Sequence, residues 1–321
     1  MNKMNSNNEY NSILECTMDI RALRYFVELV RQNSFTRAAQ VLFITQPTIS
    51  KMVRQLETEL GTPLLIRQGK SFRLTDAGQV TFERGRDVLT AQARLQAELA
   101  DLGALARGSL AIGLSPMVGS TFFAPVLQAY RIRHPQVELK IVEDGALAIE
   151  TDIAHGRLDV GVTVLPTDQA QFETRPFAYS RLCLLAPRNS AWSARKQVAM
   201  SDLADESFIL YNDDFVLSGR ILEAGRQAGF TPTIASRSNQ WDFIAAMVGA
   251  GLGIALLPRI VCEKLSPQLF CWVPLSAPVI AWHLALIWNK GGYLSHAGRA
   301  FVTCSEEILG PAYAADPGTA A

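Results

Sequence analysis

Side chains that can hydrogen-bond to DNA gather near the start of a short segment in the N-terminal part of the sequence. If residues 48–60 form a helix, its outer face carries Thr48, Lys51, Arg54 and Gln55, and Gln46 and Ser50 lie near its start. Amide, hydroxyl, ammonium and guanidinium groups at this spacing can contact base edges in the major groove. The pattern therefore predicts a helix that reads nucleic acid.

Two further helices are expected to hold this segment in place. Leu23, Phe26 and Val27 recur at three- and four-residue spacing, which predicts an amphipathic helix over residues 20–31. Ser34 stands where the N-cap of a short second helix belongs. The third helix then follows a capping hydroxyl from Thr45 and a proline suited to a first turn. Its predicted inner face is Ile49, Val53, Leu56 and Leu60.

A small hairpin and a concentration of positive charge follow the third helix. Gly61 ends that helix, and residues 63–67 and 71–74 read as two short strands around a basic tip at residues 68–70. The net charge of the chain is zero, yet residues 19–75 contain nine Lys and Arg against four Asp and Glu. A basic module joined to a body that is not basic is the electrostatic pattern of a protein that sits on phosphates.

These residues resemble a known family. Residues 26–78, which include SFTRAAQVLFITQPTISKMVRQLETELGTPLLIRQGKSFRLTDAG, look like the signature of LysR-type transcriptional regulators. Thr45 replaces the more usual serine, and Leu65-Ile66 replaces a commoner Phe and its variable neighbour. The resemblance implies recognition-helix contacts at Gln46, Pro47, Thr48, Ser50, Lys51 and Arg54, phosphate contacts at Ser34 and Thr36, and wing positions at Arg67, Lys70 and Arg73.

The next segment reads as one long helix. Residues 76–106 contain no proline, and their seam alternates four- and three-residue steps through Val88, Gln92, Leu95, Leu99, Leu102 and Ala106. This spacing is typical of a coiled coil, although a helix packed on its own domain would also fit. A helix of this length spans about 45 Å. We expect residues 76–107 to link the DNA-binding module to the body and to pair two copies, and the resemblance implies further assembly to a tetramer.

The remaining chain alternates short apolar strands with helices, which predicts an α/β body of two lobes with parallel strands. Strands are expected at residues 109–114, 137–142, 158–164, 182–185, 208–211, 233–237, 253–257 and 282–288. Helices are expected at residues 122–133, 148–155, 217–228 and 241–249. The body resembles the periplasmic-binding-protein-like sensing domain of the same family. We assign residues 108–170 with 275–310 to one lobe and residues 171–274 to the other.

A cleft between the lobes is expected to hold a small-molecule effector, because ligands of open α/β sheets bind beyond the carboxyl ends of strands. The predicted effector residues are Ser115, Met117, Val118, Gly119, Gly145, Val164, Pro166, Asp214, Phe215, Gln240 and Trp241. Hydroxyls, amides and an aromatic ring favour a small carboxylate, although each residue alone is also an ordinary capping or turn residue. The segments PMVGSTFF, VEDGA and QWDFIAAMV resemble the CidR branch of the family, which is associated with overflow and organic-acid metabolism.

Composition and motifs exclude several other functions. Apolar residues make up 49% and charged residues 19% of the 321 residues, which is ordinary for a globular protein. Five scattered cysteines and four separated histidines form no metal motif, so we expect a reduced cytoplasmic setting and no metal. The glycines of residues 249–253 follow a helix and precede a strand, the reverse of a dinucleotide site. No GxSxG elbow supports a hydrolase, and no catalytic residue or cofactor is expected.

The ends of the chain and the overall function complete these expectations. Residues 1–17 are polar and read as a disordered extension, so translation could start at Met1 or Met18, and residues 311–321 read as a flexible tail. No membrane segment is expected. We expect a ligand-responsive regulator of operator DNA, for which a contact with RNA polymerase stays open. The alternatives are a solute-binding protein of transport, which would need a secretion signal, and an α/β enzyme.

Overall fold

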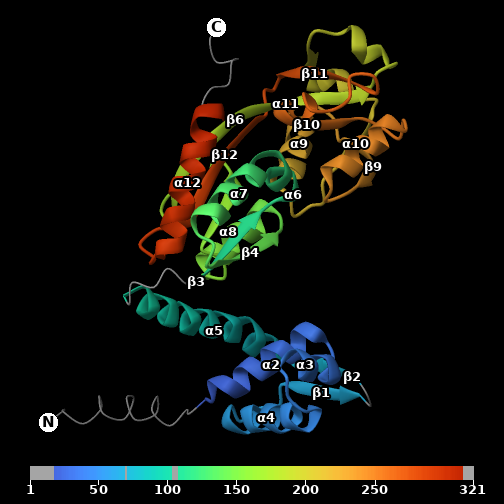
Figure 1. Ribbon diagram of the computed structural model, residues 1–321. Coiled ribbons are helices and arrows are strands. Elements are labelled where there is room, and N and C mark those ends of the chain that lie inside the picture. The colour runs from blue at the N-terminus through green and yellow to red at the C-terminus, as the bar shows by residue number, and fades with distance from the viewer. Residues whose placement is uncertain (1–17, 69–70, 103–107, 314–321) are drawn as a thin grey trace, which may run out of the picture. The chain divides into compact units, whose positions relative to one another are not determined.

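A computed structural model describes residues 18–68, 71–102 and 108–313 (Figure 1). The chain divides into two compact units, residues 1–96 and 97–321, and each is considered by itself. Four predicted features lie wholly or partly outside the described residues: the extension 1–17, the wing residue Lys70, the linker end 103–107 and the tail from residue 314.

The described part of the first unit contains three helices, a two-stranded hairpin and most of a long helix that continues into the second unit. In chain order these are α2 (Ile20–Gln32), α3 (Phe35–Val41), α4 (Gln46–Glu59), β1 (Leu65–Gln68), β2 (Ser71–Leu74) and α5 (Asp76–Leu102). Side-chain caps fix two of the helix starts. The Asp19 carboxylate accepts the N–H of Arg21 at 2.7 Å, and the Ser34 hydroxyl oxygen accepts the N–H of Arg37 at 3.3 Å. The helices predicted for this unit are therefore confirmed.

The start of α4 differs from the prediction. The helix begins at Gln46, two residues earlier than expected, with Pro47 in its first turn. The prediction that Thr45 supplies a capping hydroxyl is wrong, because its Oγ1 lies 2.8 Å from the Thr48 Oγ1 and accepts no backbone N–H of the helix. The inner face is as predicted: Ile49, Val53 and Leu56 are fully buried.

The hairpin is antiparallel, with Leu65 opposite Leu74 and Gln68 opposite Ser71. One α4 carboxylate orders the chain where it enters this hairpin. The Glu57 Oε1 accepts the backbone N–H groups of Leu64 at 2.8 Å and of Leu65 at 3.2 Å. The predicted wing is thus tied to the recognition helix by hydrogen bonds to the backbone.

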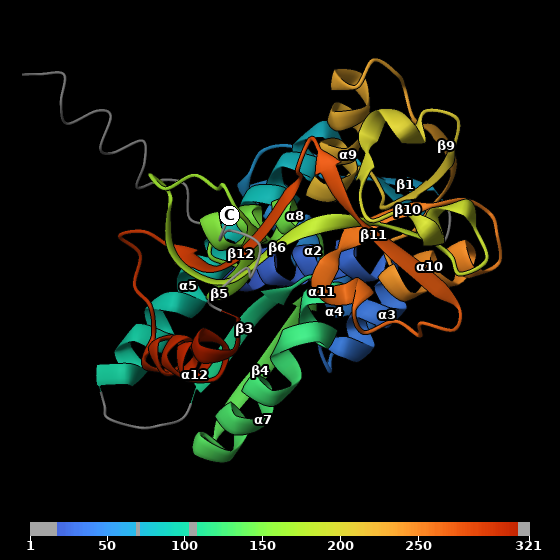
Figure 2. The same ribbon diagram turned by 90° about the horizontal axis from the view of Figure 1, so that it is seen from above.

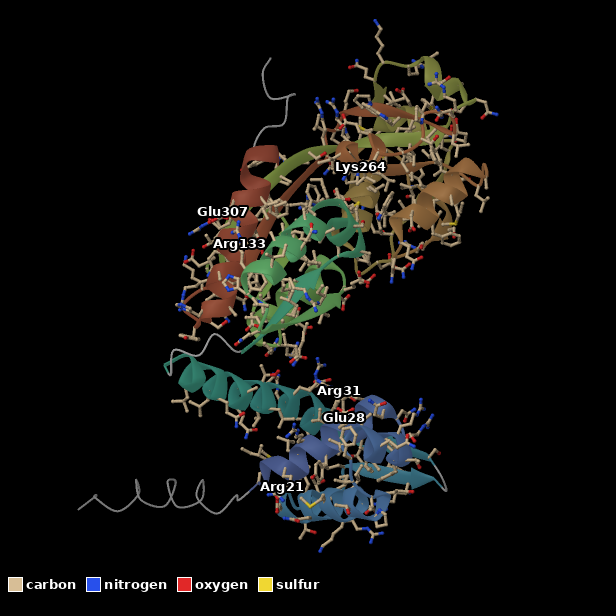
Figure 3. All side chains as sticks on the ribbon, in the orientation of Figure 1. Arg21, Glu28, Arg31, Arg133, Lys264 and Glu307 are labelled. Atoms are coloured by element: carbon tan, nitrogen blue, oxygen red, sulfur yellow. The ribbon has the colours of Figure 1, made fainter. Side chains whose placement is uncertain are left out.

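The first lobe of the second unit contains five strands of an eight-stranded sheet, with helices on both faces (Figure 2). Its strand order is β4, β3, β5, β12 and β6, with β3 parallel to β4 and β5, and β12 antiparallel to its neighbours. Helices α7 and α12 pack together on one side, where Arg133 pairs with Glu307 (Figure 3). Helix α8 packs against β5 and β12 through a separate small core. The elements are β3 (Gly108–Leu114), α6 (Pro116–Val118), the π-helical turn η1 (Gly119–Phe123), α7 (Ala124–Arg133), β4 (Val137–Glu143), α8 (Ala146–Ala154), β5 (Val160–Val164), β6 (Phe172–Pro187), β12 (Ala281–Asn289) and α12 (His296–Tyr313).

The second lobe is built around the second half of β6, which pairs with β10 and β11. Strands β8 and β9 are parallel, and a bridge from Phe208 to Ile254 joins them to the start of β10. One large core is shared by both lobes. The elements are η2 (Ala191–Ala194), β7 (Val198–Ala199), η3 (Met200–Leu203), β8 (Ser207–Leu210), α9 (Val216–Gln227), β9 (Thr233–Arg237), α10 (Trp241–Gly249), β10 (Ala255–Pro258), α11 (Arg259–Cys262) and β11 (Phe270–Ala277).

Strand β6 differs most from the prediction, which gave only residues 182–185 and placed residues 171–274 in the second lobe. The strand begins at Phe172, and its residues 172–176 and 178–181 pair with β12 in the first lobe. Pro176 interrupts the apolar pattern there and lies where the register with β12 shifts, as proline in a sheet commonly does. Strand β11 and helix α12 were not predicted.

None of the helices in the described part of the chain combines the length and apolar character that a membrane crossing requires.

Candidate DNA-binding surface and inter-lobe cleft

The outer face of α4 is open to solvent. Gln46, Pro47, Lys51, Arg54 and Gln55 are exposed, and Thr48 and Ser50 are half-buried. The Gln55 amide donates to the Glu59 Oε1 at 2.8 Å, so part of its hydrogen-bonding capacity is used within the helix. Lys51 and Arg54 extend from the helix without an ion pair among the described residues.

The acidic and basic side chains of this domain are engaged differently. Glu57 holds the start of β1, and Glu59 accepts the N–H of Asp19 at 3.0 Å. Of the basic side chains that the structure describes between residues 19 and 75, Arg31 forms an ion pair, with Glu28 at 3.9 Å (Figure 3). The basic side chains without one are Arg21, Arg24, Arg37, Lys51, Arg54, Arg67 and Arg73. The negative charges therefore serve the fold, while most positive charges have no carboxylate partner in this part of the structure.

The predicted phosphate and wing residues lie around this face. Ser34 caps α3 and Thr36 is exposed in its first turn. Arg67 is partly engaged: its Nη1 donates to the Ser50 Oγ at 3.2 Å, and its guanidinium lies 5.6 Å from the centroid of the Phe35 ring. This contact joins the wing to the recognition helix. Arg73 is exposed on β2, and Lys70 lies outside the described residues.

Two exposed residues of this region were missed by sequence reasoning. Arg37 lies in the first turn of α3 and has no ion pair within the described chain. Phe43, in the turn between α3 and α4, is 93% exposed with a φ of 54°. The signal in the sequence is a large aromatic residue in the short connection between two helices. Its positive φ, which bulky residues rarely adopt, is visible only in the structure.

A small cavity of about 30 Å³ lies where the two lobes meet, with space for little more than water. Four of the predicted effector residues, Ser115, Met117, Val164 and Phe215, line it. The other lining residues are Ala146, Tyr211, Val216, Leu217, Asn239 and Trp282. Tyr211 follows the end of β8 and could have been found from that position, whereas nothing marked Trp282, which lies inside a strand.

Contacts between the lobes close this cavity. The Trp241 indole N–H donates to the Ser120 Oγ at 3.3 Å, and the Tyr211 hydroxyl donates to the Met117 Sδ at 3.6 Å. Gly145 approaches the other lobe so closely that an added Cβ would lie 2.9 Å from the Asp214 carbonyl oxygen. The structure therefore shows the cleft in a closed form.

The remaining predicted effector residues lie elsewhere. Val118 is buried in the core, and Gly119 and Gln240 are not part of the cavity wall. Pro166 lines a different and larger cavity, together with Leu165, because both residues follow the end of β5 at Val164.

The wall of the closed cleft is mainly apolar, with a few polar but uncharged groups. None of the lining side chains is charged, and Ser115, Asn239 and Tyr211 supply its hydroxyl and amide groups. Burial raises the pKa of the Tyr211 phenol, which keeps its proton as a hydrogen-bond donor. In the described part of the chain, no three His, Cys, Asp or Glu side chains gather as metal ligands would.

The cysteines that the structure describes are buried. They are Cys183, Cys262, Cys271 and Cys304. Burial raises the pKa of the Cys262 and Cys304 thiols, so both favour the protonated, less reactive form.

Comparison with known proteins identifies both parts of the chain. Residues 20–79 match the bacterial regulatory helix-turn-helix protein model of the lysR family, and residues 103–309 match the LysR substrate binding domain. The regulator YwbI of Bacillus subtilis is 42% identical over 91% of this chain and 97% of its own length. The hydrogen peroxide-inducible genes activator of Pectobacterium carotovorum is 30% identical over 86% of this chain and 92% of its own.

A solved structure supports the same conclusion. A full-length OxyR variant from Pseudomonas aeruginosa has a TM-score of 0.66 and 28% identity, covering 91% of this chain and 94% of that one. The relatives named here are transcriptional regulators. The chain belongs to the LysR family: it is a DNA-binding transcriptional regulator with an N-terminal helix-turn-helix and a two-lobed α/β effector-binding domain.

Proposed function

We propose that this regulator reads its operator with α4 in the major groove. The contacts assigned to bases and nearby phosphates are Gln46, Pro47, Thr48, Ser50, Lys51, Arg54 and Gln55, with Ser34, Thr36, Arg67, Lys70 and Arg73 on the flanking backbone. The observation that carries this proposal is the set of described basic side chains without carboxylate partners, whose charges are free to replace counterions on DNA. Arg37 and Phe43 join the set as flanking contacts because both are exposed beside it.

A mobility-shift assay on the DNA upstream of the regulator's own gene tests this assignment. We expect Gln46→Ala combined with Arg54→Ala to weaken specific binding, since each lost base contact costs roughly 1–3 kcal/mol. Arg31→Ala is the matched control, because Arg31 already pairs with Glu28. Unchanged specific binding by the double variant would contradict the assignment of the recognition helix.

We further propose that two copies pair through α5, with the tetramer as the next level of assembly. Leu95 and Leu99 are 57% and 58% exposed on this helix, and Val88 lies seven residues before Leu95 on the same seam. A second copy would cover these side chains. Sedimentation equilibrium tests the pairing: Leu95→Glu with Leu99→Glu is expected to dissociate the dimer, and Gln96→Glu, beside them and exposed, is the control.

The proposed effector is a small organic acid bound in the inter-lobe cleft. Hydroxyl and amide groups of Ser115, Tyr211 and Asn239 would hold its polar end, and Phe215 and Trp282 its apolar part. The closed cavity must enlarge on binding, so the effector would shift the balance between closed and open lobes. A contact with RNA polymerase would relay that change to transcription.

A thermal-shift screen of acetate, pyruvate, lactate and aromatic acids tests the effector class. Binding to the folded state raises the melting temperature. A response that disappears in Val164→Phe, which fills the cavity, is expected; a response unchanged by that substitution would place the acid elsewhere.

Peroxide sensing is not proposed, although one relative is a peroxide-responsive activator. A peroxide-sensing cysteine needs an accessible thiolate. The described cysteines are buried, and Cys16 lies outside the described residues.

A further inference from the structure

A second and much larger cavity lies beside the crossing strands of the effector domain. It measures about 680 Å³, which is within the usual range for small-molecule sites. We call it the hinge pocket; its walls come from the turn after β5, helix α9 and the connection between β11 and β12 (α9 and β12 are labelled in Figure 2). Among its lining residues are Leu165, Pro166, Gly219, Arg220, Ile280 and His283.

Arg220 places a positive charge in the wall of this pocket. Its side chain is half-buried, and its Nη1 and Nη2 donate to the carbonyl oxygens of Ala281 at 2.8 Å and Leu165 at 2.7 Å. No carboxylate within the described residues pairs with it. Glu223, one turn along α9, also lines the pocket, but its carboxylate pairs with Arg226 at 2.8 Å. Burial without a counter-ion lowers the pKa of the Arg220 guanidinium.

The guanidinium also has donors to spare. An arginine side chain carries five N–H groups in a planar fork that matches a carboxylate. Two of them are used on the backbone carbonyls of Ala281 and Leu165. The remaining donors leave room for one more acceptor, and an anion would supply the missing charge.

The rest of the pocket is mainly apolar. Leu165, Pro166, Ala224 and Ile280 form carbon surfaces around Arg220. His283 adds an imidazole to the wall, although its Nδ1 is buried away from the open space of the pocket. The ligand that matches these walls is an anion with an apolar body.

The hinge pocket is separate from the inter-lobe cleft but shares a wall with it. On β12, Trp282 faces the cleft, whereas Ala281 and His283 face the hinge pocket. At the end of β5, Val164 faces the cleft and Leu165 the hinge pocket. This division follows from the alternation of side chains along a strand.

We propose that the hinge pocket is a second ligand site, which binds a small organic carboxylate on Arg220 with its apolar part against Ile280 and Pro166. Because Arg220 lies on α9 of one lobe and bonds to Leu165 of the other, a ligand there stabilises the contact that holds the lobes together. The site is independent of operator recognition, and it is distinct from the proposed effector cleft.

Calorimetric titration of the full-length protein with benzoate and hexanoate tests the site, with benzamide as the neutral analogue. Arg220→Gln removes the charge. Gly219→Phe fills the pocket and keeps Arg220, because a Cβ at Gly219 meets no heavy atom within 4 Å. Arg131→Gln, at an exposed position on α7, is the control for charge, and Val164→Phe fills the cleft instead.

We expect both acids to bind the wild type and to lose about tenfold in affinity in Arg220→Gln and in Gly219→Phe. Arg131→Gln and Val164→Phe should leave that affinity unchanged, and benzamide should bind more weakly than benzoate. Full affinity in Gly219→Phe, or no binding of either acid at millimolar concentration, would overturn the proposal. A loss confined to Val164→Phe would also overturn it and would place the acids in the cleft, as the proposed function expects.

Discussion

The recognition face of α4 and the inter-lobe cleft both present side chains that can hydrogen-bond a ligand. They differ in whether those side chains already contact other parts of the protein. Lys51 and Arg54 extend from α4 without an ion pair among the described residues. In the cleft, Tyr211 contacts Met117 and Trp241 contacts Ser120 across the lobes. The first surface is ready to bind, whereas the second must first break contacts of its own.

This difference separates two kinds of binding energy. A preformed surface gains its contacts with DNA as counterions are released from the phosphates, so its affinity falls as the salt concentration rises. A closed cleft gains ligand contacts only after the contacts between its lobes are lost, and that requirement is what allows a ligand to change the conformation. The two regions should therefore respond differently to substitution.

The largest effect is expected from the unpaired charges. Arg37→Gln with Lys51→Gln removes two of them and should lower operator affinity on the order of tenfold to a hundredfold. The slope of the logarithm of affinity against the logarithm of salt should fall by about two. Filter binding over a range of salt concentrations measures both quantities. An equal loss in Arg31→Gln, whose charge is paired with Glu28, would show that pairing does not distinguish these residues.

The next effect concerns an acid that serves the fold. Glu57→Ala leaves the N–H groups of Leu64 and Leu65 without their acceptor, which should destabilise the start of β1 by roughly 1–3 kcal/mol. Hydrogen exchange of these two amides measures the change. Glu57→Gln keeps an acceptor oxygen and should retain most of the protection; equal exchange in both variants would mean that the charge, not the hydrogen bond, matters.

The two regions also differed in how far the sequence predicted them. Helix α4 and the wing follow from spacing within a few residues, so the buried face of Ile49, Val53 and Leu56 was predicted correctly. The first half of β6 pairs with β12, which lies about a hundred residues away, and no local pattern records that partner.

The cleft was predicted only in part for a similar reason. Strand ends indicated Ser115 and Phe215, which line the cavity. Trp282 reaches the cavity from within β12, and its place depends on how that strand crosses between the lobes. Pro166 was predicted with Val164 but lines the hinge pocket, because β5 ends at Val164 and the alternation of a strand no longer fixes the side on which Pro166 lies.

A smaller effect is expected from the contacts that close the cleft. The hydrogen bond from Trp241 to Ser120 is long at 3.3 Å and partly exposed, so its contribution should be about 0.5–1.5 kcal/mol. A double-mutant cycle with Trp241→Phe and Ser120→Ala isolates it. Thermal unfolding of the effector domain in the full chain measures each variant. Additive losses in the double variant would show that the two side chains do not stabilise the closed form together.

The smallest effect is expected from oxidation. Burial raises the pKa of the Cys262 and Cys304 thiols in the folded protein, so at neutral pH they stay protonated and react slowly. As pH rises past the ordinary thiol pKa, the unfolded chain loses these protons before the folded chain does, so the free energy of unfolding should fall.

The protonated, buried thiols should also react slowly. In a Cys16→Ser variant, a thiol-reactive dye should label the native protein far more slowly than the denatured protein, and hydrogen peroxide should leave operator binding unchanged. Fast labelling of one native thiol would show instead that a buried cysteine of the effector domain becomes accessible when the lobes open. The closed region would then be sensitive to thiol oxidation, and the DNA-binding surface would not.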